Sequence, residues 1–214
     1  TQQGALERER MQNQMKVLNS AGSMPDWECT TVTQYHTGLL IEFKKPNEKF
    51  VLSSGHAGLA LYCVIEKHLG IDAEKIFNHH GVHPDYCDEC RLNCSTGSLG
   101  QGIIIALGMA LANRNRKVYT LISDGEMSEG SVYEALRIRK EQKLKNLEIY
   151  VNFNGWGAYK EIKNIVIPSE WVDPSIHIYK TNTYDFPFLG GLEAHYLTLN
   201  EETYKTAIDK LEKK

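Results

Sequence analysis

Two β-strands joined by a helix are predicted from the pattern of apolar positions in the second half of the chain. Residues 118–122 and 147–153 are short runs rich in β-branched and aromatic side chains, as is typical of strands. Between them, Ala135, Leu136 and Ile138 supply the apolar face of a helix. A strand, a helix and a second strand in this order predict a crossover, which places both strands parallel in one sheet with their carboxyl ends at the same edge.

The ends of several elements are also indicated. Ser131 and Glu134 have the spacing of a capping box, in which each side chain bonds a free backbone N–H at the start of a helix. Gly70 stands where a left-handed residue would close a helix, and Asn200 stands where a cap would open one. The remaining predicted strands cover residues 50–52, 165–167 and 176–179, and the remaining predicted helices cover residues 5–19, 57–69, 103–112 and 200–211. We therefore predict a three-layer α/β domain around a mostly parallel sheet.

The composition agrees with one domain of ordinary globular character. The 214 residues carry a formal net charge of −3 and 42% hydrophobic side chains, so a single core can form over residues 1–214, with residues 1–14 peripheral. No concentration of basic residues points to nucleic acid, and the longest apolar run, residues 103–112, is too short to span a membrane. No secretory leader is visible in a chain that begins at Thr1, and five cysteines, an odd number, indicate a reducing cytoplasm.

Asp124 and Asn154 each follow one of the two central strands. Because ligands of parallel sheets bind outside the carboxyl ends of the strands, we expect these side chains to converge there, beside the backbone N–H groups of residues 124–126. A carboxylate and an amide oxygen with several positions left open suit Mg²⁺. The sequence therefore predicts a magnesium-bridged pyrophosphate. The alternative is that Asp-Gly and Asn-Gly are two ordinary surface turns.

The sequence Asp124-Gly125-Glu126, followed about thirty residues later by Asn154-Gly155, resembles the diphosphate motif of thiamine diphosphate enzymes. That motif is written Gly-Asp-Gly followed by Asn, and Ser123 replaces its first glycine here. The resemblance implies thiamine diphosphate and Mg²⁺ as cofactors, with Ca²⁺ or Mn²⁺ as substitutes for the metal. The implied metal ligands are Asp124, Asn154 and the backbone carbonyl of Trp156, and the implied cofactor contacts of the motif are Asp124, Gly125, Glu126 and Asn154.

Two further stretches resemble motifs of the transketolase family. The pattern Leu-Ser-x-Gly-His ends at His56, which the resemblance puts near the diphosphate and the reacting carbon, whereas a lone histidine is more often structural. The glycine-rich residues 96–102 precede a predicted helix, whose start attracts anions, although alone they would describe a tight turn. They are similar to the cofactor loop of split transketolase N-terminal subunits, in which the backbone of Gly97, Ser98 and Leu99 would contact the cofactor.

The same resemblance assigns roles to three more side chains. It implies a substrate contact for His83 and a place over the diphosphate for His195, so His56, His83 and His195 form the expected catalytic set. A family glutamate at the position of Glu129 meets its symmetry mate across a dimer interface, where two close carboxylates would share a proton. The alternative for Glu129 is an acid favoured in the first turn of a helix.

Residues 78–94 allow a second interpretation. Three histidines and three cysteines fall in this turn-rich segment, and Cys-x₂-Cys is a zinc spacing. A closed structural zinc site needs four ligands, and a second cysteine pair is missing, so zinc binding and the family role of His83 both stay open. The six residues are His79, His80, His83, Cys87, Cys90 and Cys94.

The motifs together, over roughly residues 15 to 200, identify the chain as a transketolase-family protein with a thiamine diphosphate-binding fold, specifically the N-terminal, diphosphate-binding subunit of a split transketolase. The resemblance implies transfer of a two-carbon ketol unit between sugars or sugar phosphates. The family's cofactor-activating glutamate belongs to a pyrimidine-binding domain, which these 214 residues do not provide. A separately encoded C-terminal subunit and an α2β2 assembly are therefore expected.

The substrate and two competing functions stay open at this point. Ser23 stands where the family carries a substrate-facing histidine, which makes His36 an alternative polar contact and leaves the sugar undetermined. One competing function is a different thiamine diphosphate component, of the decarboxylase or 2-oxoacid dehydrogenase type. The other is a noncatalytic, zinc-binding assembly module built on the cysteine-rich segment.

Overall fold

The computed structural model of this protein describes residues 47–157, 159–180, 192 and 200–212. The predicted helix over residues 5–19 and the candidate residues Ser23, His36 and His195 lie outside these described ranges.

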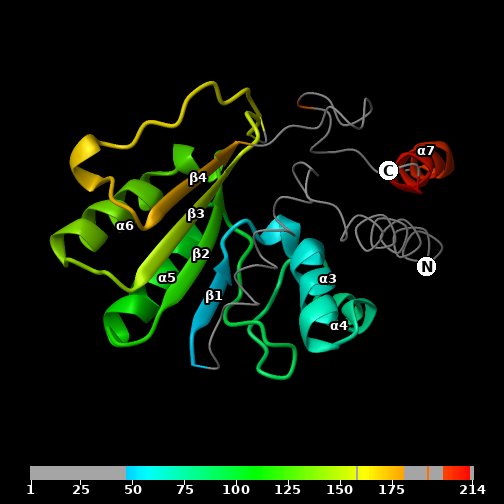
Figure 1. Ribbon diagram of the computed structural model, residues 1–214, viewed down its shortest axis with the longest axis horizontal. Coiled ribbons are helices and arrows are strands. Elements are labelled where there is room, and N and C mark those ends of the chain that lie inside the picture. Colours follow the sequence, from blue (N-terminus) through cyan, green and yellow to red (C-terminus); the bar gives the residue numbers. More distant parts are fainter. Residues whose placement is uncertain (1–46, 158, 181–191, 193–199, 213–214) are drawn as a thin grey trace.

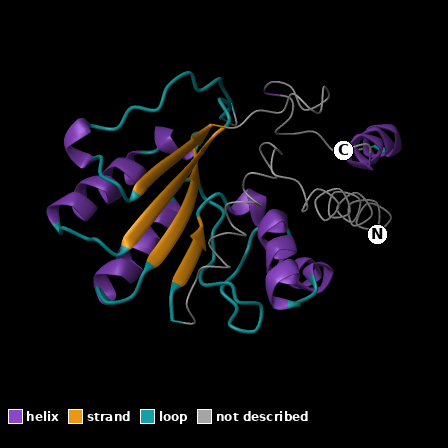
Figure 2. Ribbon diagram, in the orientation of Figure 1, coloured by secondary structure: helices purple, strands orange, loops and turns teal. Residues whose placement is uncertain are grey.

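A four-stranded sheet with every strand parallel forms the centre of the molecule (Figures 1 and 2). The strand order β1-β2-β3-β4 follows the sequence. Helices cover both faces of the sheet, so the predicted three-layer α/β architecture and the parallel crossover between the two central strands are confirmed. The strands are β1 (Lys49–Leu52), β2 (Val118–Ser123), β3 (Leu147–Phe153) and β4 (Ile176–Lys180).

The helices divide between the two faces of the sheet (Figure 1). The first pair, α3 (Gly58–Leu69) and α4 (Ala73–His80), lies on one face, and the second pair, α5 (Gln101–Ala112) and α6 (Gly130–Glu141), lies on the other. None of the helices in the described part of the chain combines the length and apolar composition required to cross a membrane. The remaining elements are α7 (Glu201–Glu212) and the 3₁₀ turns η1 (Gly55–Ala57), η2 (Glu126–Ser128) and η3 (Ser169–Trp171).

Two hydrophobic cores sandwich the sheet. Because successive side chains of a strand point to opposite faces, Val51 packs in the core beneath α5 and α6, whereas its neighbours Phe50 and Leu52 pack beneath α3 and α4. The predicted helix ends are also observed. Gly70 closes α3 with a left-handed φ of 70°, and the Asn200 side chain accepts a hydrogen bond from the Thr203 N–H at 2.9 Å.

The predicted capping box is wrong. Helix α6 begins at Gly130, its N-cap residue is Glu129, and no side chain caps it. Ser131 instead donates its hydroxyl to the carbonyl of Gly100 at 3.0 Å, which joins α6 to the loop before α5. A tertiary partner therefore outcompetes the local bond that the spacing of Ser131 and Glu134 suggests.

Residues 165–167 are not a strand. They belong to a connection without regular structure before η3, in which Ile165 and Ile167 pack against the core and Val166 is exposed. The Val166 carbonyl accepts from the Tyr133 hydroxyl at 3.0 Å, so α6 holds this segment. Extended loops and strands share the same alternation of apolar and exposed side chains, which explains the wrong prediction.

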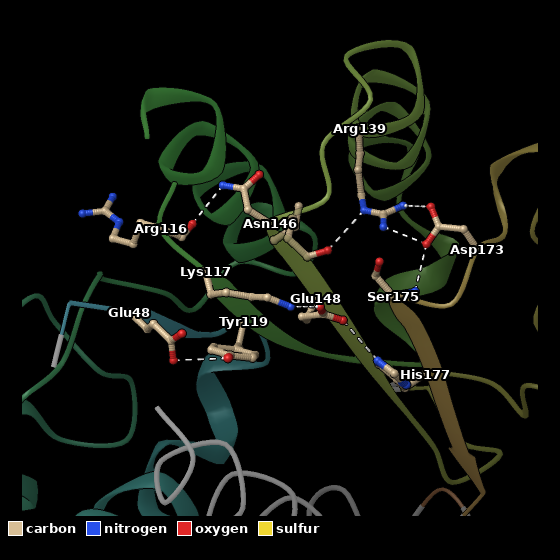
Figure 3. Close-up of polar contacts among 11 residues, drawn as sticks. Glu48, Arg116, Lys117, Tyr119, Arg139, Asn146, Glu148, Asp173, Ser175 and His177 are labelled. Carbon is tan, nitrogen blue, oxygen red and sulfur yellow. Dashed lines mark hydrogen bonds and ion pairs between the residues drawn. The ribbon is translucent and has the colours of Figure 1, made fainter. Parts of the chain in front are cut away.

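A network of charged and amide side chains holds the edge of the sheet where the strands begin, called the amino edge below (Figure 3). Arg139, only 1% exposed, donates two hydrogen bonds of 2.8 Å to Asp173 and a third of 3.3 Å to the Leu147 carbonyl. Hydrogen bonds from this guanidinium lower the pKa of Asp173 to about 2. Asn146 donates to the carbonyls of Ala110 and Arg116 at 2.9 Å.

A second part of this network lies on the neighbouring strands. Glu148 of β3 forms an ion pair with Lys117 and contacts His177 of β4 at 3.3 Å (Figure 3). The His177 ring stacks on Tyr150, with ring centroids 4.6 Å apart. The amino edge thus links the start of each strand from β2 to β4 through side chains of opposite charge or complementary hydrogen bonding.

Candidate functional site

The opposite edge of the sheet, where the strands end, is called the carboxyl edge, and it brings the Asp124 side chain to the turn that carries Asn154. The Asp124 N–H extends the pairing of β2 with β3 by donating to the Asn152 carbonyl at 2.9 Å. The Asp124 carboxylate then reaches the turn after β3, where Oδ2 accepts from the Gly155 N–H at 2.7 Å. Asp124 thus reaches the Asn154-Gly155 turn through the backbone of that turn, and the convergence of the Asp124 and Asn154 side chains stays a prediction.

Asp124 is a fully buried acid, with none of its surface exposed. Burial raises the pKa of Asp124 to about 6, while N–H donors from Gly155 and Gly125 oppose that rise. Each carboxylate oxygen accepts one of these backbone bonds and can still accept another ligand. A bound cation would favour the charged carboxylate and offset the cost of burying it.

The two other predicted metal ligands lie in the turn after β3. The side-chain oxygen of Asn154 accepts from the Trp156 N–H at 2.8 Å, which fixes the amide against its own turn. Trp156 faces Glu161 in a short antiparallel bridge, whose two hydrogen bonds join Gly157 to Lys160 and Ile162 to Gly155. Neither bond uses the Trp156 carbonyl. A carboxylate, an amide oxygen and a backbone carbonyl are the hard oxygen donors that suit Mg²⁺, Ca²⁺ or Mn²⁺.

The turn from Ser123 to Glu126 satisfies its own backbone donors. The Gly125 N–H donates to Asp124 Oδ1 at 2.9 Å, and the Glu126 N–H donates to the Ser123 hydroxyl at 3.2 Å. Ser123 stands where the family motif has glycine, so its hydroxyl adds an internal acceptor that glycine lacks. A phosphate group at this turn would compete with that hydroxyl for the Glu126 N–H.

Glu126 ties three separate parts of the chain together. Its buried carboxylate accepts hydrogen bonds from the hydroxyls of Ser53 and Ser54, at 2.5 and 2.6 Å, and from the N–H groups of Gly100 and Ser123, at 2.9 and 3.0 Å. Four donors on two oxygens leave little capacity for a ligand. Its side chain therefore organises the predicted site from within, and a cofactor contact from Glu126 stays a prediction.

The glycine-rich loop lies directly against the turn that carries His56. A side chain at Gly55 would come within 2.5 Å of the Thr96 carbonyl and 2.7 Å of the Gly97 nitrogen, so only glycine allows this approach. The exposed His83 ring also packs against this loop, because a Cβ at Gly97 would lie 3.2 Å from the imidazole. The structure thus gathers His56, His83 and Gly97 around one loop.

The end of the glycine-rich loop is where the remaining predicted residues lie. Ser98 is exposed, Leu99 is half-buried, and Gly100 adopts a left-handed φ of 75° before α5 begins. A Cβ at Gly100 would lie 2.9 Å from the Cβ of Glu129, so Glu129 packs against this loop. Its contact with a symmetry mate across a dimer interface stays a prediction.

Three important residues of this edge were missed by sequence reasoning. Ser53 and Ser54 supply hydroxyl donors to Glu126, and the Thr96 hydroxyl donates to the Leu52 carbonyl at 2.7 Å. The first two sit inside the Leu-Ser-x-Gly-His motif, which was weighed only for its histidine. A buried glutamate requires donors, and two serines directly after a strand were the available signal.

The cysteine-rich segment separates into two groups. Cys94 is buried in the core beneath α5 and α6. His80, Cys87 and Cys90 instead gather beside α4, with every pair of their ligand atoms within 4.8 Å. Of the six histidines and cysteines in this segment, these three are the ones whose ligand atoms the structure brings together, and zinc binding stays open.

Comparison with known proteins decides the family. The description "Transketolase, thiamine diphosphate binding domain" belongs to a family model that matches residues 43–157, more than half of the chain. This chain belongs to the transketolase family. The matched region contains Asp124, Asn154 and the glycine-rich loop, so the motifs that carried the resemblance lie within it.

Several transketolase sequences are similar to this chain. The 6-deoxy-6-sulfo-D-fructose transketolase subunit SqwG of a Clostridium species is 36% identical over 117 residues, covering 50% of this chain and 42% of that protein. Human transketolase is 39% identical over 122 residues, covering 52% of this chain and 19% of that protein. The chain therefore spans less than half of the length of these curated transketolases.

Solved transketolase structures share the fold. The transketolase of Leishmania mexicana superposes with a TM-score of 0.57 and 15% identity, covering 93% of this chain and 44% of that one. A Pichia stipitis transketolase variant gives a TM-score of 0.57 and 19% identity, covering 76% of this chain and 29% of that one. At these identities, the comparison with the transketolase structures supports the α/β fold alone.

Proposed function

We propose that this transketolase-family chain is the N-terminal, diphosphate-binding subunit of an enzyme that transfers a two-carbon ketol unit between sugars. The observation that carries the proposal is the bond between the buried Asp124 carboxylate and the Gly155 N–H, which puts the two halves of the diphosphate motif side by side. The alternative interpretation of the motif is two independent surface turns. In that case the acid of the first turn would not be buried against the backbone of the second.

In this proposal the carboxyl edge holds thiamine diphosphate and a divalent cation. Asp124, the Asn154 side chain and the Trp156 carbonyl bind the cation, and their hard oxygen donors fit it. The backbone of Gly97, Ser98 and Leu99 lines the rest of the cofactor. When bound, thiamine diphosphate supplies the carbanion chemistry of the reaction.

The histidines are proposed to act on the sugar. His56 and His83 are exposed imidazoles gathered around the glycine-rich loop, where they can bind hydroxyl groups and transfer protons. His195 is proposed to complete this set. Buried Glu126 has a different task, because it positions the Ser53-Ser54 turn and the glycine-rich loop relative to β2.

A second, separately encoded subunit is proposed to complete the enzyme. SqwG, which matches this chain, is named a transketolase subunit, and this supports a divided architecture. Glu129 is proposed to meet its symmetry mate in an α2β2 assembly. The four free cysteines of the described residues are compatible with the proposed reducing cytoplasm.

Calorimetric titration with thiamine diphosphate and Mg²⁺ tests the site. Changing Asp124→Ala removes a buried ligand and should weaken binding by at least roughly 100-fold, or about 3 kcal/mol. Asp209→Ala, the same change at an exposed residue of α7, should leave binding unchanged. Equal affinity of the wild type and Asp124→Ala would overturn the assignment.

Substrate profiling tests the reaction. The chain would be combined with its proposed pyrimidine-binding partner subunit, and ketoses and 2-oxoacids would be offered as alternative donors. Two-carbon transfer from a ketose supports the proposal. Carbon dioxide release from a 2-oxoacid would instead favour the decarboxylase or dehydrogenase type.

A further inference from the structure

A group of soft metal ligands lies apart from the carboxyl-edge residues described above. His80 is the last residue of α4, and Cys87 and Cys90 follow in the next loop. His80 Nε2 lies 3.4 Å from Cys90 Sγ, and the ligand atoms of all three residues lie within 4.8 Å of one another. All three side chains are half-buried. A metal ion could therefore reach them from solvent, while the surrounding chain restricts their motion.

The backbone of the loop is shaped to aim the two sulfurs at the histidine. Cys87 and Leu92 exchange two hydrogen bonds, of 3.0 and 2.8 Å, which close a tight antiparallel turn. Arg91 has a φ of 61°, an uncommon left-handed conformation for a residue with a side chain. Inside the turn, the Cys90 N–H donates to Cys87 Sγ at 3.2 Å. This bond fixes Cys87 and Cys90 relative to each other within the turn.

We propose that His80, Cys87 and Cys90 bind a zinc ion. With Zn–S near 2.3 Å and Zn–N near 2.0 Å, tetrahedral geometry requires about 3.5 Å between a nitrogen and a sulfur ligand. The observed 3.4 Å between His80 and Cys90 already meets this requirement. Two thiolates and an imidazole select zinc over magnesium or calcium, and three protein ligands leave the fourth position to water.

The zinc ion would fasten the loop that carries His83. His83 lies between His80 and Cys87 in the sequence, and its ring packs on Gly97. Pro84, the next residue, accepts a hydrogen bond from the Thr96 N–H at 3.0 Å. Metal binding at both ends of residues 80–90 would therefore hold His83 against the glycine-rich loop. This positioning role rests on the proposed function, whereas zinc binding itself does not.

Elemental analysis of the purified full chain, prepared with a reducing agent and without added metal, tests the proposal. We expect stoichiometric zinc in the wild type and at least a tenfold reduction in Cys87→Ser and in Cys90→Ser, because each removes one of only three protein ligands. His79→Gln is the matched control. His79 touches His80 edge-on but is exposed and outside the cluster, so this variant should keep its zinc.

Cobalt substitution gives a readout that does not depend on how the variants fold. Stoichiometric Co²⁺ added to the metal-free wild type should produce thiolate-to-cobalt charge-transfer absorption with the intensity of a tetrahedral site. Three results would overturn the proposal. They are the absence of this absorption, a Cys87–Cys90 disulfide in the freshly purified protein, and zinc that stays bound in both serine variants. Thiamine diphosphate binding, measured separately, can fail without changing any of these results.

Discussion

The two edges of the sheet satisfy their buried charges in opposite ways. At the amino edge, buried Arg139 meets the carboxylate of Asp173, and the pKa of that acid falls to about 2. At the carboxyl edge, the partners of Asp124 are backbone N–H groups, and burial raises its pKa to about 6. At the amino edge the acid already has a positively charged partner in the folded chain. At the carboxyl edge the acid has none among these partners, and a bound cation would stabilise its charged form. The amino edge therefore supports the fold, whereas the carboxyl edge is the one at which we propose that a ligand binds.

The largest expected effect is at the amino edge, in Arg139→Met. The substitution leaves Asp173 and the Leu147 carbonyl without their buried donor, and we expect a loss of about 4 kcal/mol in the free energy of unfolding. Urea denaturation measures it. Arg137→Met, at an exposed position of the same helix that forms an ion pair with Glu141, should cost less than about 0.5 kcal/mol. Similar losses in the two variants would contradict the importance of the amino-edge pair.

Glu126→Gln should have the next largest effect, at the carboxyl edge. The new amide would point a donor at the N–H of Gly100 or Ser123, so a buried backbone group would lose its partner at a cost of about 3 kcal/mol. The exposed Glu134→Gln provides the control. Thermal unfolding followed by circular dichroism compares them. A stable Glu126→Gln protein would mean that the loops do not need this carboxylate.

Asp124→Asn should act in the opposite direction and stabilise the metal-free protein. A folded-state pKa raised from 3.8 to about 6 means that ionised Asp124 destabilises the fold by at most about 3 kcal/mol above pH 6. Because asparagine also loses an acceptor, we expect a net gain of about 1 to 2 kcal/mol at pH 7.5. The gain should fade as pH falls from 6 towards 4, where the folded wild type takes up its proton.

Urea denaturation in EDTA at pH 7.5 and 4.5 measures this gain, with Asp209→Asn as the exposed control. The same variant should lose magnesium-dependent cofactor binding. A variant that is less stable than the wild type at both pH values would show that Asp124 belongs with the acids of the amino edge.

Ser123→Gly should have the smallest effect. It removes the hydroxyl that accepts from the Glu126 N–H and restores the glycine of the family motif, at a cost of about 1 kcal/mol in stability. The freed N–H becomes available to a phosphate, so calorimetry should find thiamine diphosphate affinity unchanged or increased. Weaker binding would indicate that the serine hydroxyl itself contacts the cofactor.

The features that sequence predicted correctly depend on short stretches of chain. The strands ending at Ser123 and Phe153, and the glycine that closes α3, follow from local composition and backbone preference. The convergence of Asp124 with the turn after β3 followed from the general geometry of parallel crossovers.

The features that sequence could not predict depend on partners far away in the chain. Ser131 bonds Gly100, 31 residues earlier, and this contact overrides the capping box. Glu126 finds Ser53 and Ser54 more than 70 residues away. Helix α4 ends at His80, and the position of this end determines that His80 is the histidine beside Cys87 and Cys90. The spacing of histidines and cysteines in residues 78–94 does not predict where the helix ends.

The four bonds accepted by Glu126 have a consequence for how this edge can move. The turn before α3, the loop before α5 and the end of β2 all donate to the buried Glu126 carboxylate, so opening any one of them removes donors from that carboxylate and weakens the attachment of the other two. Hydrogen exchange at these three segments is therefore expected to occur together, as a single cooperative opening. A ligand that contacts any one of the three segments would slow exchange across all of them.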